Sequence, residues 1–324
     1  MYIMGLDIGY SNMKIAAGLH DGSTFEVRVF PVGAGPRHLM PASIKGQTAA
    51  VQVLVDDQEF VACIEPERLA NWERALHDDY PASVSYRALF HAALLTSGRS
   101  VIDKLVTGLP VSHWLDEKRR AAVAKRLMGF HAIGRDRAVR IVDVSVIPQP
   151  VGAYLDTAVA SGREQEFADA EVLILDPGFF SVDWVLMSGT DIQYEFSSSS
   201  TLATSRLLEE VEKLIYQEFE CRVPVNKLER AIREGRKDVP IFSDRVELAP
   251  LLGRAAERVS DMVMNNVRAS MRSKGADITK VVLAGGGAEY YRPAVAAIFP
   301  RAEIILPKNP VLANARGFWH YAQL

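Results

Sequence analysis

The sequence has only two cysteines, Cys63 and Cys221, among its 324 residues, and it has no long apolar run. Two cysteines so far apart exclude a disulfide framework and a cysteine-rich zinc site. No apolar segment approaches the roughly 20 residues that cross a bilayer, so we expect no membrane helix. The chain enters a predicted strand within two residues of Met1, which leaves no room for a signal peptide. These absences predict a cytoplasmic protein.

A strong charge bias is also missing. The net charge is −3, with 24% charged and 48% hydrophobic residues, as in a soluble globular protein. A chain of this charge has no broad electrostatic attraction for nucleic acid or for an anionic membrane, so we expect no direct partner of either kind. The length suggests two domains with substantial cores.

An apolar strand and an Asp-x-Gly turn open the chain. Asp7 ends the strand, Gly9 permits a sharp turn, and a second strand starts near Met13. Three side chains suited to an anion follow: Ser11, Asn12 and Lys14. Backbone N–H groups in such a hairpin can hold phosphates while the carboxylate serves a metal. An ordinary turn is the alternative interpretation.

The same pattern returns about half a chain later. An apolar run ends in Asp176-Pro177-Gly178, two aromatic residues follow, and a new apolar strand begins after Ser181. We expect the two hairpins to face each other across a cleft. Asp7 and Asp176 would then lie on opposite sides of one metal–phosphate group.

Three further segments have the composition of ligand-contacting junctions. A strand at residues 101–107 runs into Gly108-Leu109-Pro110, which is either a ligand-binding sheet edge or a simple strand stop. Gln149 opens a helix that follows the strand at 140–147. A strand at 280–283 leads into three glycines, 285–287, which either bring bare backbone and the N–H groups of the next helix toward a ligand or form a flexible turn.

The pattern of segments also predicts the domain organisation. Domain I would comprise residues 1–150 and 308–324, with a small insertion at 31–75. Domain II would comprise 151–307, with a helical insertion at 197–275 that includes one long helix over 246–272. The serine run at 197–201 is either a linker or the N-cap of the next helix.

Five elements occur in a fixed order: a hairpin, a crossover helix, a second hairpin, the triple-glycine loop and a second crossover at 309–319. This order resembles that of the actin/Hsp70/hexokinase ATPase superfamily. Four segments, 5–14, 106–110, 148–156 and 309–319, resemble the bacterial plasmid-segregation actins of the ParM/StbA type. The resemblance implies an actin-like (ribonuclease H-like) fold. In that α/β fold, two duplicated domains enclose a nucleotide cleft.

The resemblance also implies roles for individual residues. Asp7 and Asp176 match the two aspartates that hold a divalent cation, Mg²⁺, usually through water. The catalytic residues would be Gln149, Asp176 and Asp183; Gln149 and Asp183 match positions near the attacking water, and Asp176 acts through the cation. The residues that match nucleotide-binding positions for ATP and ADP are Asp7, Gly9, Tyr10, Ser11, Asn12, Lys14, Gly178, Phe179, Phe180, Ser181, Gly285, Gly286, Gly287 and Glu289.

Two features depart from the family pattern. Plasmid-type relatives often carry glutamate where this chain has Gln149, whereas actin carries glutamine. Glutamine can orient water but cannot act as a general base at neutral pH. Pro177 and the Phe179-Phe180 pair replace the glycine- and threonine-rich second loop of many relatives, which leaves the phosphate contacts there open.

We therefore expect an ATPase that polymerises into filaments and moves plasmid DNA through a DNA-binding adaptor. One alternative is a small-molecule kinase acting on a sugar or carboxylate, with Asp143 or Asp156 as its base. Another is a non-polymerising scaffold for cell division or pilus assembly. A phosphate-release assay with and without acceptor would separate the first two.

Overall fold

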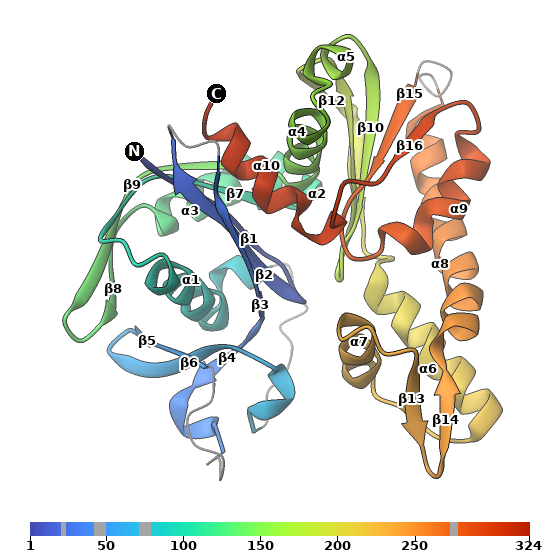
Figure 1. Cartoon of the computed structure of the whole chain (residues 1–324), viewed down its shortest axis with the longest axis horizontal. Helices are drawn as coiled ribbons and strands as arrows, with labels where there is room; N and C mark the ends of the chain where they lie inside the picture. The colour runs from blue at the N-terminus through green and yellow to red at the C-terminus, as the bar shows by residue number, and fades with distance from the viewer. Residues whose placement is uncertain (21–23, 42–49, 71–78, 273–277) are drawn as a thin grey trace. The chain divides into compact units, whose positions relative to one another are not determined.

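The computed structural model describes residues 1–20, 24–41, 50–70, 79–272 and 278–324, and it divides into two compact units (Figure 1). Unit 1 comprises Met1–Gly162 and Leu312–Leu324, and unit 2 comprises Arg163–Val311. Part of the predicted insertion at 31–75 and the last residues of the predicted insertion at 197–275 lie outside the described residues.

A six-stranded sheet in the order β3-β2-β1-β7-β9-β8 forms the centre of unit 1. Its strands are β1 (Tyr2–Ile8), β2 (Asn12–Leu19), β3 (Glu26–Pro31), β7 (Val101–Leu109), β8 (Gly129–Gly134) and β9 (Arg137–Pro148). A smaller sheet contains β4 (Gly33–Pro36), β6 (Gln58–Ile64) and β5 (Val51–Val55). The helices are α1 (Val84–Thr96), α2 (Val111–Leu115), α3 (Glu117–Leu127), α4 (Gln149–Ser161) and α10 (Ala313–Tyr321).

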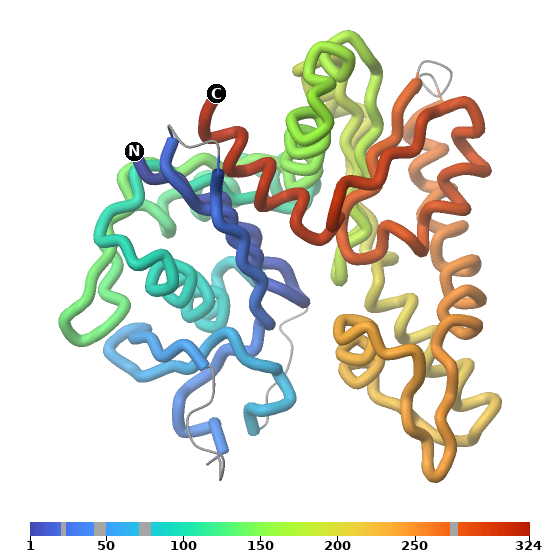
Figure 2. Tube along the Cα trace, in the orientation of Figure 1, coloured from blue at the N-terminus to red at the C-terminus, as the bar shows by residue number. Residues whose placement is uncertain are grey.

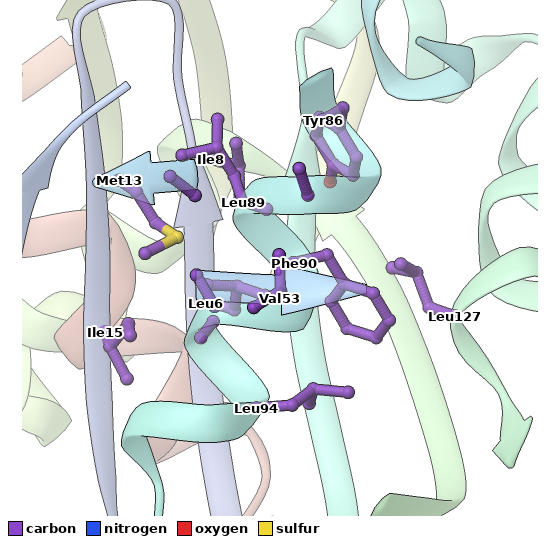
Figure 3. Packing of buried hydrophobic residues seen from close by; sticks show 14 of the residues in the cluster. Leu6, Ile8, Met13, Ile15, Val53, Tyr86, Leu89, Phe90, Leu94 and Leu127 are labelled. Atoms are coloured by element: carbon purple, nitrogen blue, oxygen red, sulfur yellow. The ribbon is translucent and has the colours of Figure 1, made fainter. Parts of the chain in front are cut away.

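Strand β1 and helix α1 meet in the core of unit 1 (Figure 3). Leu6 of β1 and Leu89 of α1 are fully buried, and Phe90 is 1% exposed. The helix begins after Ser83, whose hydroxyl accepts a hydrogen bond from the N–H of Tyr86 at 3.1 Å, as an N-cap serine does. This burial holds β1 in place, and therefore also Asp7 near the end of β1.

Unit 2 repeats the topology of unit 1. Its sheet has the order β12-β11-β10-β15-β16, which corresponds to β3-β2-β1-β7-β9. In both sheets the central strand pairs with an antiparallel hairpin on one side and with a parallel strand on the other. The strands are β10 (Glu171–Pro177), β11 (Val182–Ser188), β12 (Asp191–Ser200), β15 (Ile278–Leu283) and β16 (Glu303–Ile305).

A second core in unit 2 lies among its inserted helices. These elements are α6 (Thr204–Phe219), α7 (Val225–Arg233), the hairpin β13 (Asp238–Ile241) and β14 (Asp244–Glu247), and α8 (Leu248–Ser270). Two more helices, α5 (Glu164–Ala168) and α9 (Ala288–Ile298), complete the unit. The prediction of a helix-rich insertion did not include this hairpin.

The last helix of the chain returns to unit 1 (Figure 2), where α10 packs against α4 and β1. A Cβ added at Gly317 of α10 would lie 1.7 Å from the carbonyl oxygen of Gly152 in α4. A Cβ at Gly5 of β1 would lie 2.3 Å from the carbonyl oxygen of Ala315. Because α4 packs on α10 in this way, the units divide after residues 162 and 311 instead of the predicted 150 and 307.

Two predicted segments differ in detail. The long helix begins at Leu248, not 246, because the preceding residues form β14. Both interpretations of the serine run at 197–201 were wrong, since β12 continues through Ser200 and the N-cap of α6 is Ala203, which has no side-chain cap. Across the described residues, no helix is long and apolar enough to span a bilayer.

A histidine pair in unit 1 predicts a pH-dependent stability. His91 of α1 is 6% exposed, and its Nδ1 lies 2.6 Å from the carbonyl oxygen of Leu54; His131 of β8 contacts the carbonyl oxygen of Leu127 through Nε2 at 2.9 Å. Burial lowers the pKa of both imidazoles. Each histidine therefore takes up a proton at higher pH in the unfolded chain, with a pKa of about 6.5, than in the folded chain.

We expect the free energy of unfolding to fall as the pH drops below about 6.5, by up to about 1.4 kcal/mol per pH unit for each histidine. Urea unfolding between pH 7.5 and 5 measures this slope. His131→Asn should reduce the slope, whereas His38→Asn, at an exposed position, should leave it unchanged. An equal slope in wild type and His131→Asn would contradict the assignment.

Candidate functional site

The first hairpin places an acidic and a basic side chain side by side. Asp7 of β1 is the cross-strand partner of Lys14 in β2, and the Nζ of Lys14 lies 3.0 Å from Oδ2 of Asp7. Gln149 at the start of α4 donates from Nε2 to Oδ1 of Asp7 at 3.1 Å. The Asp7 carboxylate is only 2% exposed, and each of its oxygens accepts a hydrogen bond from a different part of the chain.

Glycine at position 108 makes room for this arrangement. A Cβ at Gly108 would lie 2.7 Å from Cγ of Gln149 and 2.4 Å from Cζ of Phe318. The preceding residue, Thr107, donates its hydroxyl to the carbonyl oxygen of Leu6 at 2.7 Å, which joins β7 to β1 beside Asp7. The Gly-Leu-Pro end of β7 therefore has a packing role at the candidate site.

The turn of the first hairpin is fixed by short-range contacts. The N–H of Gly9 donates to the carbonyl oxygen of Asn12 at 3.1 Å, and Nδ2 of Asn12 donates to the hydroxyl of Ser11 at 3.2 Å. The ring of Tyr10 stacks on Tyr80, with centroids 4.6 Å apart. Sequence reasoning missed Tyr80, because nothing in its own segment relates it to the turn.

The second hairpin has the same register with different chemistry. Asp176 of β10 is the cross-strand partner of Asp183 in β11, so a second carboxylate stands where the first hairpin has lysine. Asp183 is 1% exposed and accepts hydrogen bonds from the hydroxyls of Ser181, at 2.6 Å, and Ser199. Ser199 was also missed; it belongs to the serine run, and its pairing with Asp183 becomes visible only from the register of β12.

The triple-glycine loop packs directly on the second hairpin. Gly285 has φ +74°, and a Cβ there would lie 2.2 Å from Oδ1 of Asp176. The N–H of Gly287 donates to the carbonyl oxygen of Pro177 at 2.9 Å. Around Gly286, by contrast, no heavy atom lies within 4 Å of an added Cβ. The structure thus brings together the predicted residues of the hairpin and the loop and leaves an open approach at the middle glycine.

Three other residues of unit 2 were predicted to bind nucleotide: Gly178, Phe179 and Phe180. The carbonyl oxygens of Gly178 and Phe179 accept from the N–H groups of Thr204 and Ser205, at 3.2 and 2.9 Å, so the turn caps the start of α6. The side chain of Phe179 packs against the helical core, and Phe180 is half-buried.

Glu289, in the first turn of α9, faces solvent. Its side chain is 70% exposed, and its carboxylate lies 4.0 Å from the guanidinium of Arg292. An exposed ion pair of this kind is weak and does little to fix either side chain. A nucleotide-binding role for Glu289 stays a prediction.

A cavity of about 410 Å³ lies within unit 2, and one of its lining residues, Tyr290, follows the triple-glycine loop in the sequence. Most of its lining surface is apolar and includes Ile232 of α7, Leu248 and Leu252 of α8, and Tyr290 of α9. Three charged residues next to the β13–β14 hairpin complete the lining: Arg236, Lys237 and Glu247. Tyr290 belongs to the first turn of α9, and its N–H donates to the carbonyl oxygen of Gly287 at 2.9 Å. A cavity of this size, with a mostly apolar lining and a few polar groups, is typical of small-molecule sites. No sequence motif indicated this pocket, because its residues come from three separate segments.

The carboxylates fit a nucleotide-bound Mg²⁺ better than a metal held by protein alone. Among the described residues, no group of three or more His, Cys, Asp or Glu side chains could hold a metal ion. Mg²⁺ keeps several waters and usually binds one or two carboxylates together with substrate phosphates. Asp7 and Asp176, each at the end of a buried strand with a glycine turn beside it, suit that mode of binding.

The two carboxylates considered for a kinase base have other surroundings. Asp156 of α4 is 1% exposed and pairs with Arg316 of α10. Nε of Arg316 donates to Oδ1 at 2.7 Å and a terminal nitrogen donates to Oδ2 at 2.6 Å, a bidentate geometry that ties up both oxygens. Asp143 lies exposed on β9. Neither has the arrangement of a general base beside an acceptor pocket.

Comparison with known families gives two matches that follow each other along the chain. The family described as "Actin like proteins N terminal domain" matches residues 5–152, and the family described as "Archaeal actin homologue MreB-like, C-terminal" matches residues 174–297. An archaeal actin homolog of Thermoplasma volcanium is 22% identical over 328 residues, covering 98% of each chain. These matches confirm the expected resemblance.

Solved structures confirm the expected fold. The crystal structure of Ta0583, an archaeal actin homolog, superposes with a TM-score of 0.79 at 20% identity, covering 100% of this chain and 99% of that one. The same homolog in complex with ADP gives 0.76 at 20% identity, covering 100% and 99%. A subunit of a 15-stranded ParM filament from Clostridium botulinum gives 0.77 at 18% identity, covering 99% of each chain. At these identities the likeness establishes the two-domain α/β fold.

Proposed function

This chain belongs to the actin-like ATPase family, and from that premise we propose that it binds Mg–ATP with its two Asp-ended hairpins, hydrolyses it and assembles into filaments. The observation that carries the proposal is the cluster of Asp7, Lys14 and Gln149. At the end of one strand, the carboxylate of Asp7 lies 3.0 Å from the ammonium of Lys14 and 3.1 Å from the amide nitrogen of Gln149. Phosphoryl transfer requires mainly such positioning and charge stabilisation.

In unit 1, Lys14 and the turn amides bind phosphate in this proposal. The bound Mg²⁺ supplies charge neutralisation on the phosphate oxygens. Lys14 shares the face of the hairpin with Asp7, so its ammonium can contact a phosphate oxygen while remaining near that carboxylate. Gln149 would orient the attacking water or hold the Asp7 carboxylate that would serve the cation. It would not remove a proton, because an amide is not a base at neutral pH.

In unit 2, Asp176 serves the cation and Asp183 orients water. The hydrogen bonds from Ser181 and Ser199 fix the Asp183 carboxylate and satisfy its charge inside the fold. The open backbone at Gly286 faces the nucleoside, and the apolar cavity beside Tyr290 accepts the base. The ADP complex of the archaeal homolog supports a nucleotide as the ligand.

The cellular part of the proposal is plasmid DNA segregation. The ParM relative that superposes on this chain is a filament subunit, which supports head-to-tail self-association here. In this scheme a DNA-binding adaptor links the filament to plasmid DNA, since a chain with net charge −3 has no broad attraction for DNA of its own. Loss of the γ-phosphate removes contacts made by the hairpins and thereby changes the stability of the subunit contacts.

We expect purified protein to release phosphate from Mg–ATP without any acceptor and to sediment as polymer when ATP is present. Malachite-green phosphate release and high-speed pelleting, each with ATP, ADP and no nucleotide, measure the two properties. A small-molecule kinase would instead release little phosphate and would consume ATP only with an acceptor.

A panel of sugars and short carboxylates is the control for the kinase alternative. Acceptor-dependent ADP formation, or ATP binding with no turnover and no pellet under any salt condition, would contradict the proposed function.

A further inference from the structure

We propose that Phe242, at the turn of the β13–β14 hairpin, is a contact residue through which one copy of this chain binds the next in a filament. This inference rests on the proposed function. Phe242 is 85% exposed, so its ring contributes almost nothing to the core of unit 2. An exposed aromatic ring is the kind of side chain that supplies binding energy when a partner buries it.

The backbone at Phe242 shows that folding does not favour this residue. Ile241 and Asp244 pair across the hairpin, so Phe242 and Ser243 form a two-residue turn. The first central residue of such a turn usually has positive φ and is glycine, asparagine or aspartate. Phe242 has φ +53°, a left-handed conformation that a bulky side chain rarely adopts. The sequence therefore places an aromatic ring where glycine would fold better.

The rest of the hairpin presents this ring on a rigid support. Val239, Ile241 and Val246 are 3 to 7% exposed and belong to the core formed with α6, α7 and α8. Across the two strands, Nε of Arg245 donates to the carboxylate of Asp238 at 2.8 Å. A ring held on a packed hairpin loses little conformational freedom on binding, which favours a stable contact.

The turn lies at the opposite end of the β13–β14 hairpin from Glu247, which lines the candidate base cavity. Helix α6 starts at the second hairpin, where the N–H of Ser205 donates to the carbonyl of Phe179. It extends for 16 residues, or about 24 Å, to an end that Figure 1 shows at the same end of the unit as the β13–β14 turn. Tyr216 and Phe219, near that end of α6, are 50% and 38% exposed. The distal end of unit 2 thus carries three exposed aromatic rings.

The partner that buries these rings is a second copy of this chain. A contact that joins this end of one copy to a different surface of the next is heterologous, and such contacts generate open filaments when they do not close into rings. Pairing of two Phe242 turns with each other would instead be isologous and would stop at a dimer. The filament of the ParM relative favours the heterologous form.

The test compares Phe242→Gly and Phe242→Trp in the full chain by pelleting over a concentration series with Mg–ATP. Glycine keeps the turn without its strain, so we expect the melting temperature to stay the same or rise while the critical concentration for assembly increases at least about tenfold. Tryptophan retains an aromatic ring and should assemble like wild type. Affinity for a fluorescent ATP analogue should be unchanged in both variants, because Phe242 lies at the other end of the hairpin from Glu247 and does not line the candidate cavity.

The outcomes separate this contact from the proposed function. Assembly of Phe242→Gly at the wild-type concentration would overturn the contact and leave the filament proposal intact. Wild-type protein that binds ATP but never pellets would overturn both. A photo-reactive phenylalanine at position 242 gives a second measurement: ATP-dependent cross-links to another surface of a second copy are expected, and cross-links only to the partner's own β13–β14 hairpin would overturn the heterologous contact.

Discussion

Replacement of Asp176 by asparagine is expected to lower Mg²⁺-dependent ATP hydrolysis at least about 100-fold, a loss typical of removing one preorganised charge-stabilising group. Asp176 ends β10 and is 6% exposed, in contact with the backbone of Gly285. Asparagine has the same size, so it preserves that packing while removing the charge that the cation requires. Phosphate release at saturating ATP measures the effect, and thermal unfolding should change little.

Asp143→Asn is the matched control for this variant. It removes one carboxylate from an exposed position on β9 and should leave hydrolysis unchanged. Normal turnover in Asp176→Asn would refute the cation assignment. Loss of turnover in Asp143→Asn but not in Asp176→Asn would revive the kinase alternative, because Asp143 was one of its candidate bases.

Gly317→Ala is expected to destabilise unit 1 by about 3 kcal/mol or more, at the upper end of overpacking effects. The added Cβ would lie 1.7 Å from the carbonyl oxygen of Gly152 and 2.3 Å from its carbonyl carbon. Both atoms belong to the backbone of α4, so no side chain can move aside and the two helices must separate. Separation would also strain the buried pair of Asp156 and Arg316, which joins the same helices. The urea midpoint of unfolding measures the loss.

Gly253→Ala provides the opposite expectation with the same chemical change. Gly253 lies inside α8, and an added Cβ there meets no atom within 4 Å. Alanine in an open helical position should stabilise the protein by about 0.5–1 kcal/mol. If both substitutions had similar effects, the close crossing of α4 and α10 would be refuted.

Local patterns in the sequence predicted most of the elements around the site. The strand of Asp7, the strand of Asp176 and the helix opened by Gln149 were all expected, because apolar runs, glycine turns and a proline-rich helix start act over a few residues. The β13–β14 hairpin was not expected. Its turn contains Phe242 and Ser243 instead of the asparagine or glycine that marks a hairpin in sequence, so the signal was absent for the same reason that the turn is strained.

The sequence by itself determined that two Asp-x-Gly hairpins and a triple-glycine loop occur in a fixed order, because each is encoded by neighbouring residues. Only the tertiary structure decided that Gln149 bonds Asp7 across 142 positions of the chain, and that Ser199 holds Asp183. The ion pair between buried Asp156 and Arg316, and the cavity beside Tyr290, likewise depend on the tertiary structure. These contacts join residues far apart in the chain, and sheet register and helix crossing bring such residues together without leaving a periodic pattern in the sequence.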